Sequence, residues 1–518
     1  MCCIGVPFAF GFLAIALGQD ANWDLQNYHW YNPYAFLNHR FLFDLAPGSY
    51  YNPVLDVPLF LLAQHLSARE CGFLLGLVQG LNFVPLYAIA LAVAPQWARW
   101  KNGTGGAMLS ALGVTGGGGL GLVGATSYDN VVSVLVLTAL GAIVRSMRGA
   151  TESADKTYAI AGLLTGFGIG MKLPTAIFGV GLVCACFSIE GPLRRRLRRT
   201  VWFGFPALVG MLVFGGYWMW WLWSNLGNPV FPYFNNVFGS EMALSATYRD
   251  ERFVPTSFID AALFPLRFTM DPFKAGDCNF TDLRIALLYG VLALSAAWIF
   301  GSRHWTRVGT PQQLTPEARL VLSAAAFSYI TWLALFGIYR YIITLEMLAP
   351  LLTAALIATW PIRHRTKITI ACLCAVMLIV GTRPWSGDRI EWESRFVEVA
   401  APRLKDPLHA MVVVAGFVPS SWVIPSFPPE VPFVRLQGYS HSPDDGNVGL
   451  AREARSRVAQ HRGTLYVLYA ESEEALVRDV LRKFDLVGDF AACERVRGNL
   501  AAGLRLCPVS RGSIQAGR

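Results

Sequence analysis

Long apolar runs recur along the first three quarters of the chain and constrain its fold more than any other feature. The chain is 54% hydrophobic and 15% charged, whereas soluble domains carry about 25% charged residues. A helix crosses the hydrocarbon core of a bilayer with roughly 17–25 apolar residues. We therefore expect an α-helical multi-pass membrane protein with eleven transmembrane helices, at 2–18, 71–94, 104–124, 129–145, 157–171, 173–189, 203–223, 283–300, 319–338, 341–360 and 367–382. The run 54–66 is too short to span and is expected to lie in the interface or to re-enter.

Basic residues fall on alternate loops, and this bias predicts the orientation. Lys and Arg are enriched in short cytoplasmic loops, and the loops concerned carry Arg99 and Lys101; Arg145, Arg148 and Lys156; Arg194–Arg199; Arg303 and Arg307; and Arg363, Arg365 and Lys367. The N-terminus is then inside as an uncleaved anchor, because it lacks the basic start of a signal peptide. Residues 19–70, 224–282 and the tail from 383 lie outside. The basic residues behind the net charge of +9 thus mark the cytoplasmic loops, which face anionic lipid headgroups. We therefore expect no nucleic-acid partner.

The stretch Asp20 to Asn52, within the first outside loop 19–70, is dense in polar and aromatic residues. It holds two early carboxylates, Asp20 and Asp24, and one histidine, His29. Charges and unpaired polar groups are costly in lipid. The loop therefore predicts a polar, aromatic-lined site at the membrane surface.

Three further places carry charge beside apolar spans, and each has two interpretations. Asp129, in a short outside turn, is either a helix N-cap or a second acid facing the outside. Lys172 stands between two short spans and either snorkels to the interface or binds an anion such as a lipid phosphate. Arg340 either pairs with Glu346 or points at a phosphate.

The glycine run Gly116–Gly119 lies inside the expected span 104–124. A phosphate-cradling loop requires a preceding strand, and none is expected here. Close packing with a flexible or broken helix is favoured instead.

The character of the sequence changes near residue 383. Met411–Val414 and Leu465–Tyr469 have the apolar pattern of strands, and Glu474–Phe484 has that of an amphipathic helix. We expect two domains, 1–382 in the membrane and 383–518 as a small α/β domain outside. Cys493 and Cys507 lie in this tail, where a disulfide between them is expected.

These features together resemble the GT-C superfamily of integral-membrane glycosyltransferases, which take a sugar from a polyprenyl-phosphate carrier. The resemblance lies in an Asp soon after the first span (Asp24-Leu25-Gln26-Asn27-Tyr28), an acid in the next outside turn (Asp129), a glycine-rich helix followed by Lys (Gly162 to Lys172), the late pair Arg340-Tyr341, and the string Gly227–Pro232. It covers about residues 1–382 and leaves the tail unmatched.

The resemblance implies a transferase at the outer face of the cytoplasmic membrane. Lys172, Arg340, Tyr341 and Arg284 are then candidates to bind the donor phosphate, because fixed positive charge stabilises a leaving phosphate. Asp24 is the candidate general base, with Asp20 in reserve and Asp129 as a further catalytic acid. Candidates to bind the sugar or acceptor are Tyr28, His29, Trp30, Tyr31 and Asn228. Attack opposite the leaving phosphate predicts inversion.

Cofactor, acceptor and reaction class stay open at this point. Asp24 and Asp129 are the carboxylates that would hold a divalent cation such as Mg²⁺ or Mn²⁺. The acceptor is a glycan, a lipid or a protein. A transporter or flippase of lipid-linked sugars is the alternative from another class, although it predicts internal repeats that this sequence lacks. An envelope polysaccharide polymerase or ligase shares the same carrier.

Overall fold

The computed structural model describes residues 2–94, 103–148, 154–304, 312–385, 387–446 and 448–512, with the side chains of 301–304 left out. Of the basic residues used for topology, Arg99, Lys101 and Arg307 lie outside the described residues, as does the side chain of Arg303. The chain forms two compact units. The first contains Met1–Leu17, Phe73–Gly216 and Asp250–Gly387, and the second contains Gly18–Gly72, Tyr217–Arg249 and Asp388–Arg518. The unit boundary near 387 is close to the domain boundary expected at 382, whereas two earlier segments, predicted to lie outside, also belong to the second unit.

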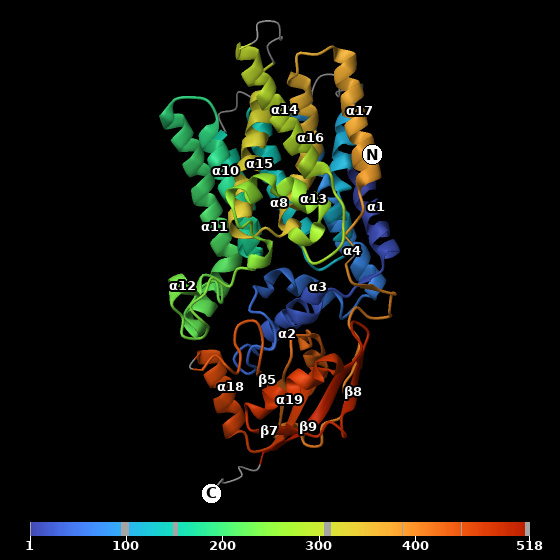
Figure 1. Cartoon of the computed structure of the whole chain (residues 1–518), viewed down its shortest axis with the longest axis vertical. Helices are drawn as coiled ribbons and strands as arrows, with labels where there is room; N and C mark the ends of the chain where they lie inside the picture. Colours follow the sequence, from blue (N-terminus) through green and yellow to red (C-terminus); the bar gives the residue numbers. More distant parts are fainter. Residues whose placement is uncertain are drawn as a thin grey trace. The chain divides into compact units, whose positions relative to one another are not determined.

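The first unit is helical (Figure 1). Its helices, some continuing into the second unit, are α1 (Cys2–Leu17), α4 (Ala68–Gly80), α5 (Phe83–Val93), α6 (Thr104–Val114), α7 (Gly117–Gly121), α8 (Asp129–Ser146), α9 (Ala154–Met171), α10 (Ala176–Ser188), α11 (Leu193–Leu226), α13 (Phe258–Met270), α14 (Arg284–His304), α15 (Pro316–Leu335), α16 (Ile343–Thr359) and α17 (His364–Gly381), with short 3-10 turns η5 (Leu173–Thr175), η6 (Glu251–Phe253), η7 (Pro272–Lys274) and η8 (Tyr339–Ile342).

Six helical segments among the described residues are long and apolar enough to cross a membrane, and four shorter helices are also apolar. The six are Ala68–Val93, Asp129–Ser146, Leu193–Leu226, Pro316–Leu335, Tyr339–Thr359 and His364–Gly381; the four are Cys2–Leu17, Thr104–Val114, Leu173–Ser188 and Arg284–Phe300. The run predicted at 157–171 is helix α9. The predicted multi-pass helical fold is confirmed.

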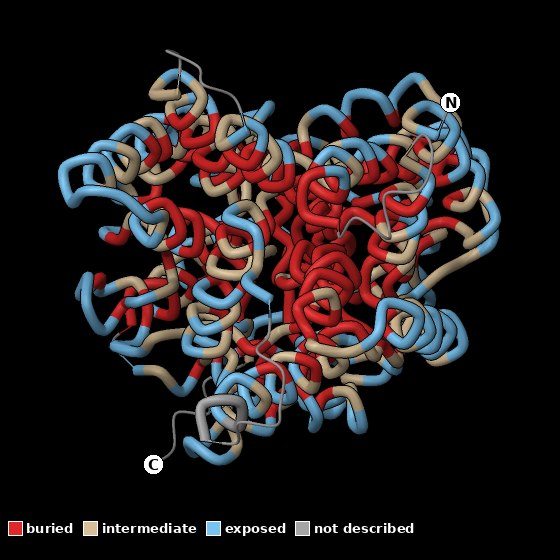
Figure 2. The backbone as a smooth tube through the Cα atoms, turned by 90° about the horizontal axis from the view of Figure 1, so that it is seen from above, coloured by how far each residue is buried: buried red, intermediate tan, exposed pale blue. Residues whose placement is uncertain are grey.

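Helix α16 forms the core of this unit, and α17 lies at its edge. Almost every residue of α16 is buried, as expected for a helix that is apolar all round. In contrast, only 11% of the apolar window of α17 is buried, and it exposes Leu373, Val376 and Val380. Figure 2 shows buried backbone near the middle of the view and exposed backbone toward the rim. Such an apolar exposed face is suited to lipid contact.

Glycines permit a close contact between two helices of this unit. Gly162, Gly166 and Gly170 recur every fourth residue on α9 and face α11, and a Cβ at Gly166 would lie 2.0 Å from the Ala207 carbonyl oxygen. Small residues at this spacing let helix backbones approach. The predicted break in 104–124 is also present, since α6 ends at Val114 and α7 begins at Gly117.

The second unit contains a mixed β-sheet. Its elements are β1 (Gln19–Asp20), the π-helix η1 (Leu25–His29), α2 (Tyr31–Leu37), η2 (Pro53–Leu55), α3 (Val57–Leu62), α12 (Asn235–Phe238), β2 (Arg389–Ile390), β3 (Val399–Ala400), η9 (Pro407–His409), β4 (Ala410–Val414), η10 (Ser421–Ser426), β5 (Phe433–Arg435), α18 (Gly449–Gln460), β6 (Thr464–Ala470), η11 (Glu471–Glu473), α19 (Glu474–Arg482), β7 (Leu486–Gly488), β8 (Glu494–Gly498) and β9 (Leu504–Arg511).

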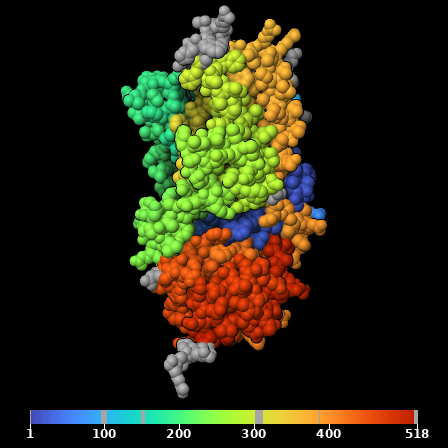
Figure 3. All heavy atoms as spheres, in the orientation of Figure 1, coloured from blue at the N-terminus to red at the C-terminus, as the bar shows by residue number. Residues whose placement is uncertain are grey.

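The sheet has the order β3-β8-β9-β6-β4-β5, with β7 also pairing with β9. Strand β4 pairs parallel to both β5 and β6, whereas β9 pairs antiparallel to β6, β7 and β8. All five residues of β4 are buried, which is typical of a strand covered on both faces. In Figure 3 the red atoms of the C-terminal residues gather into one body. The predicted strands 411–414 and 465–469 and the helix from 474 are confirmed as β4, β6 and α19.

The first outside loop packs on this sheet instead of remaining a free loop. Arg40 donates to both Asp44 oxygens at 2.8 and 2.9 Å and to the Val431 carbonyl at 2.7 Å. Asp44 also accepts from the Phe433 backbone N–H at 2.9 Å. The segment beside Asp44 then continues alongside β5, with Leu45 paired in parallel to Val434. The run 54–66, predicted to lie in the interface or to re-enter, forms η2 and α3 of this unit.

Candidate functional site

Two cations converge on one aromatic ring in the first unit. Lys172 follows α9 directly, and Arg340 and Tyr341 lie in η8. The Lys172 ammonium lies 5.7 Å and the Arg340 guanidinium carbon 5.4 Å from the centre of the Tyr341 ring. Aromatic faces attract cations at these distances. Three of the four residues predicted to bind the donor phosphate are therefore neighbours.

Asp129 pairs with the first of these cations. Its carboxylate lies 2.8 Å from the Lys172 ammonium, and the exposed fractions of the two side chains are 6% and 17%. Lys172 also donates to the Ser127 carbonyl oxygen. Asp129 is the first residue of α8, and the N-cap position belongs to Tyr128, so the N-cap interpretation of Asp129 is wrong. The pair holds the ammonium in one place.

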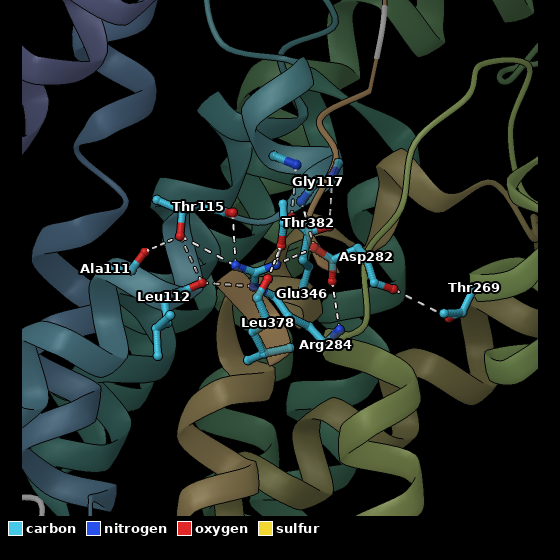
Figure 4. A network of polar contacts seen from close by, with 12 residues as sticks. Ala111, Leu112, Thr115, Gly117, Thr269, Asp282, Arg284, Glu346, Leu378 and Thr382 are labelled. Carbon is cyan, nitrogen blue, oxygen red and sulfur yellow. Dashed lines mark hydrogen bonds and ion pairs between the residues drawn. The ribbon is translucent and has the colours of Figure 1, made fainter. Parts of the chain in front are cut away.

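Arg284, predicted to bind phosphate, is instead a structural residue. Its side chain is buried, and all five guanidinium N–H groups have acceptors: Asp282, the carbonyls of Leu112 and Thr115, and the hydroxyls of Thr115 and Thr382. Figure 4 shows this network. An arginine has no sixth donor, so a lipid phosphate would have to displace one of these partners.

The same network holds the glycine run. Asp282 accepts from the Gly117 N–H at 2.7 Å, and Glu346 accepts from the N–H groups of Gly118 and Gly119 at 3.0 and 2.9 Å. The first N–H groups of a helix lack acceptors within the helix, and here two carboxylates accept from them. A side chain at Gly116 would place its Cβ 1.8 Å from a Glu346 oxygen. The glycines thus allow internal carboxylates, rather than a phosphate, to reach the backbone.

The two early carboxylates lie in the second unit. Asp20 is 1% exposed and accepts from the backbone and side-chain amides of Asn22 at 3.1 and 2.9 Å. Asp24 immediately precedes η1 and is 9% exposed. Asp20 therefore has a structural role in a turn, whereas Asp24 stays the candidate base.

His29 has a partner that the sequence reasoning did not identify. Its Nδ1 lies 2.6 Å from an Asp56 oxygen, and both side chains are buried. Beside it, the Tyr28 ring lies 4.2 Å from the imidazole and 4.5 Å from the Tyr51 ring. The sequence signal for this partner is that Asp56 is the one charge in the apolar run 54–66. A carboxylate on Nδ1 fixes the tautomer and orientation of a histidine.

Three residues predicted to bind sugar are buried in the second unit, and their assignment is corrected. The Tyr31 hydroxyl donates to Asp44 at 2.8 Å, and burial together with this carboxylate raises the pKa of Tyr31. Trp30 packs between Phe60 and Phe396. Asn228 accepts from the Val230 N–H and donates to a carbonyl five residues on, so it shapes a turn. All three side chains are buried and have partners within the protein, so we do not propose them as sugar ligands.

Cys493 and Cys507 form the predicted disulfide. Within the described ranges, no group of three or more His, Cys, Asp and Glu side chains is arranged to hold a metal ion.

Comparisons with known proteins give structural matches only. No family model and no curated protein matches the sequence. The chain is similar to the Archaeoglobus fulgidus oligosaccharyltransferase in complex with Zn and sulfate (12% identity, TM-score 0.49, covering 92% of this chain and 69% of that one). It is also similar to ArnT from Cupriavidus metallidurans bound to undecaprenyl phosphate (11% identity, TM-score 0.43, covering 100% and 98%).

A third match is the A. fulgidus oligosaccharyltransferase AglB with an inhibitory peptide and a dolichol-phosphate (11% identity, TM-score 0.44, covering 91% and 70%). The matched proteins are GT-C glycosyltransferases, the superfamily that the sequence motifs resemble. With every TM-score below 0.5, the likeness carries no argument about chemistry, which must come from this chain's own residues.

Proposed function

We propose that this chain is a membrane glycosyltransferase that moves a sugar from a polyprenyl-phosphate carrier to an acceptor at the outer face of the cytoplasmic membrane. In this proposal the N-terminus is inside and the C-terminal domain outside. The observation that carries the proposal is the placement of Lys172 and Arg340 on the Tyr341 ring, 5.7 and 5.4 Å from its centre.

Breaking the glycosyl bond leaves negative charge on the carrier phosphate. Preorganised cations stabilise such charge, because their dipoles and charges need no rearrangement as the bond breaks. Lys172 and Arg340 are the proposed phosphate ligands, with Tyr341 between them. Asp129 is a positioning residue that fixes the ammonium at 2.8 Å.

The acceptor hydroxyl must lose a proton as it attacks the anomeric carbon. We assign this role to Asp24, a carboxylate of the polar first loop that directly precedes η1. Tyr28 and His29 are proposed to contact the sugar or the acceptor, with Asp56 orienting the imidazole at 2.6 Å. Attack opposite the leaving phosphate inverts the anomeric centre.

Asp129 does not fit the expected role of a metal ligand. Its carboxylate already neutralises the Lys172 ammonium, and a divalent cation would have to compete with that charge. We assign no step of the reaction to a metal ion.

The test is transfer of labelled sugar by the purified full-length chain in nanodiscs, using a panel of polyprenyl-phosphate sugars. Lys172→Met and Arg340→Met are each expected to lower turnover by about 100-fold, the usual effect of removing one charge-stabilising group. Lys274→Met, which removes an exposed lysine of the same unit, is the matched control and should transfer like the wild type. Asp24→Asn should lose turnover while keeping the melting temperature.

Turnover at the wild-type rate in both Lys172→Met and Arg340→Met would refute the assignment of these residues to the phosphate. If no donor is turned over but labelled lipid-linked sugar crosses the membrane of proteoliposomes, the transporter alternative is correct. Polymerisation of preassembled glycans would instead identify the polymerase or ligase alternative. The product's anomeric configuration, read by NMR, tests inversion.

A further inference from the structure

Three aromatic rings from distant parts of the sequence meet in the second unit. The Trp23 and Tyr439 rings are 5.5 Å apart and nearly perpendicular, and the Tyr439 and Phe417 rings are 6.1 Å apart. Trp23 directly precedes Asp24, the proposed base. We call Trp23, Phe417 and Tyr439 the aromatic triad.

Two rings of the triad, Phe417 and Tyr439, are exposed, although aromatic side chains are normally buried. Phe417 is 42% and Tyr439 is 68% exposed. In the described part of 388–512, the other exposed large apolar side chains are Leu408 and Val487, and neither is aromatic. Singly exposed apolar residues need no explanation, but two exposed rings in contact with each other and with a third indicate a binding surface.

The loops that carry Phe417 and Tyr439 leave the same edge of the sheet. Strands β4 and β5 are parallel, and the loops follow their carboxyl ends at Val414 and Arg435. Ligands of α/β sheets bind at this edge. The position of the triad therefore coincides with the place where such a sheet presents a ligand.

The loop after β4 is held by charged side chains. Glu473 accepts from the N–H groups of Phe417 and Val418, with shortest distances of 2.9 and 3.1 Å. The buried guanidinium of Arg435 donates to the Gly416 carbonyl at 3.0 Å. A rigid loop binds at a smaller entropic cost than one that must be ordered.

The loop after β5 is held as firmly. His441 Nε2 donates to the Arg435 carbonyl at 2.9 Å, and the Gly438 N–H donates to the His441 carbonyl at 2.9 Å. Between them, the amide oxygen of Gln437 is buried without a hydrogen-bond partner. An unpaired buried acceptor is costly, and this one lies two residues before Tyr439 in the chain.

We propose that the aromatic triad binds a sugar ring of the acceptor, so that the acceptor is a glycan. This proposal rests on the proposed function and names its acceptor. Aromatic faces are electron-rich and suit the C–H face of a sugar ring. Asp24, the proposed base, then directly follows one residue of the aromatic triad, Trp23, in sequence.

The first test is direct binding of full-length protein in nanodiscs to a printed array of neutral oligosaccharides and of peptides. Glycan binding by the wild type should fall on the order of tenfold in the double variant Phe417→Ala with Tyr439→Ala, because each ring contact contributes a modest amount. Tyr439→Phe keeps the ring and should bind normally. Leu408→Ala removes an exposed apolar side chain of the same unit and is the matched control.

The second test is the acceptor KM in the transfer assay, which the double variant should raise without changing the donor KM. An unchanged acceptor KM alongside normal transfer would overturn the triad and leave the transferase standing. Triad-dependent glycan binding without any transfer would keep the triad and overturn the transferase. Binding to peptides only, or to no glycan, would overturn the triad.

Discussion

Acid should weaken the loop that carries Tyr439, through the buried imidazole of His441. This side chain is 2% exposed. Burial lowers its pKa to about 4, although the bond to the Arg435 carbonyl and the charge of Asp445 act in the opposite direction, and the Arg435 guanidinium adds to the lowering. The free histidine titrates near 6.5. The opened loop therefore binds a proton more tightly than the closed one.

The sign and size follow from linkage. A depressed histidine pKa contributes full stability above about pH 6.5, and that stability is lost as the pH falls toward 4. At pH 5 the opened state gains a factor of about 30 from protonation, which corresponds to about 2 kcal/mol of local opening free energy. The change between pH 7.5 and 6.5 should be small.

Hydrogen exchange of the segment 433–446, corrected for the intrinsic pH dependence of exchange, measures this opening. Protection in the wild type should fall about 30-fold between pH 7.5 and 5. His441→Gln keeps a side-chain N–H for the Arg435 carbonyl but cannot titrate, so its protection should change little. Equal losses of protection in the wild type and in His441→Gln would refute the assignment of the titrating group.

Three further predictions concern stability. Arg40→Met leaves the carboxylate of Asp44 buried without its cation and should cost about 3–5 kcal/mol, seen as a lower melting temperature; Arg40→Met with Asp44→Leu should recover much of it. Cys507→Ser opens a disulfide of sequence separation 14 and should cost about 3 kcal/mol, with no further loss on adding a reductant. Arg284→Lys has too few donors for the five acceptors and should lower the free energy of unfolding by about 1–3 kcal/mol, seen as a lower melting temperature, whereas a normal melting temperature would contradict its structural role.

The membrane helices could be predicted from sequence because hydropathy is a local property. The predicted span 129–145 and helix α8, Asp129–Ser146, differ by a single residue at one end. The break within 104–124 was also predictable, since glycines weaken a helix and four of them adjoin one another. These features depend on residues within a few turns of each other.

The packing of the first outside loop could not be predicted in the same way. Arg40 bonds to the Val431 carbonyl, 391 positions away, and Asp56 meets His29 across 27 positions. Nothing within the loop distinguishes a tyrosine that stacks on sugar from one such as Tyr31 that bonds to a buried carboxylate. Long-range partners decide which polar residues remain available, and a single sequence does not list them.

Two cations beside membrane helices differ in their burial and in their hydrogen-bond partners. Arg284 and Lys172 looked alike in sequence, each standing next to an apolar span. The structure gives Arg284 five acceptors and 1% exposure, so its charge serves the contact between α6, α14 and α17. Lys172 keeps 17% exposure, an ion pair with Asp129 and a shared aromatic ring with Arg340. A buried guanidinium with five acceptors stabilises the fold, whereas a partly exposed cation that an acid orients is suited to an incoming phosphate.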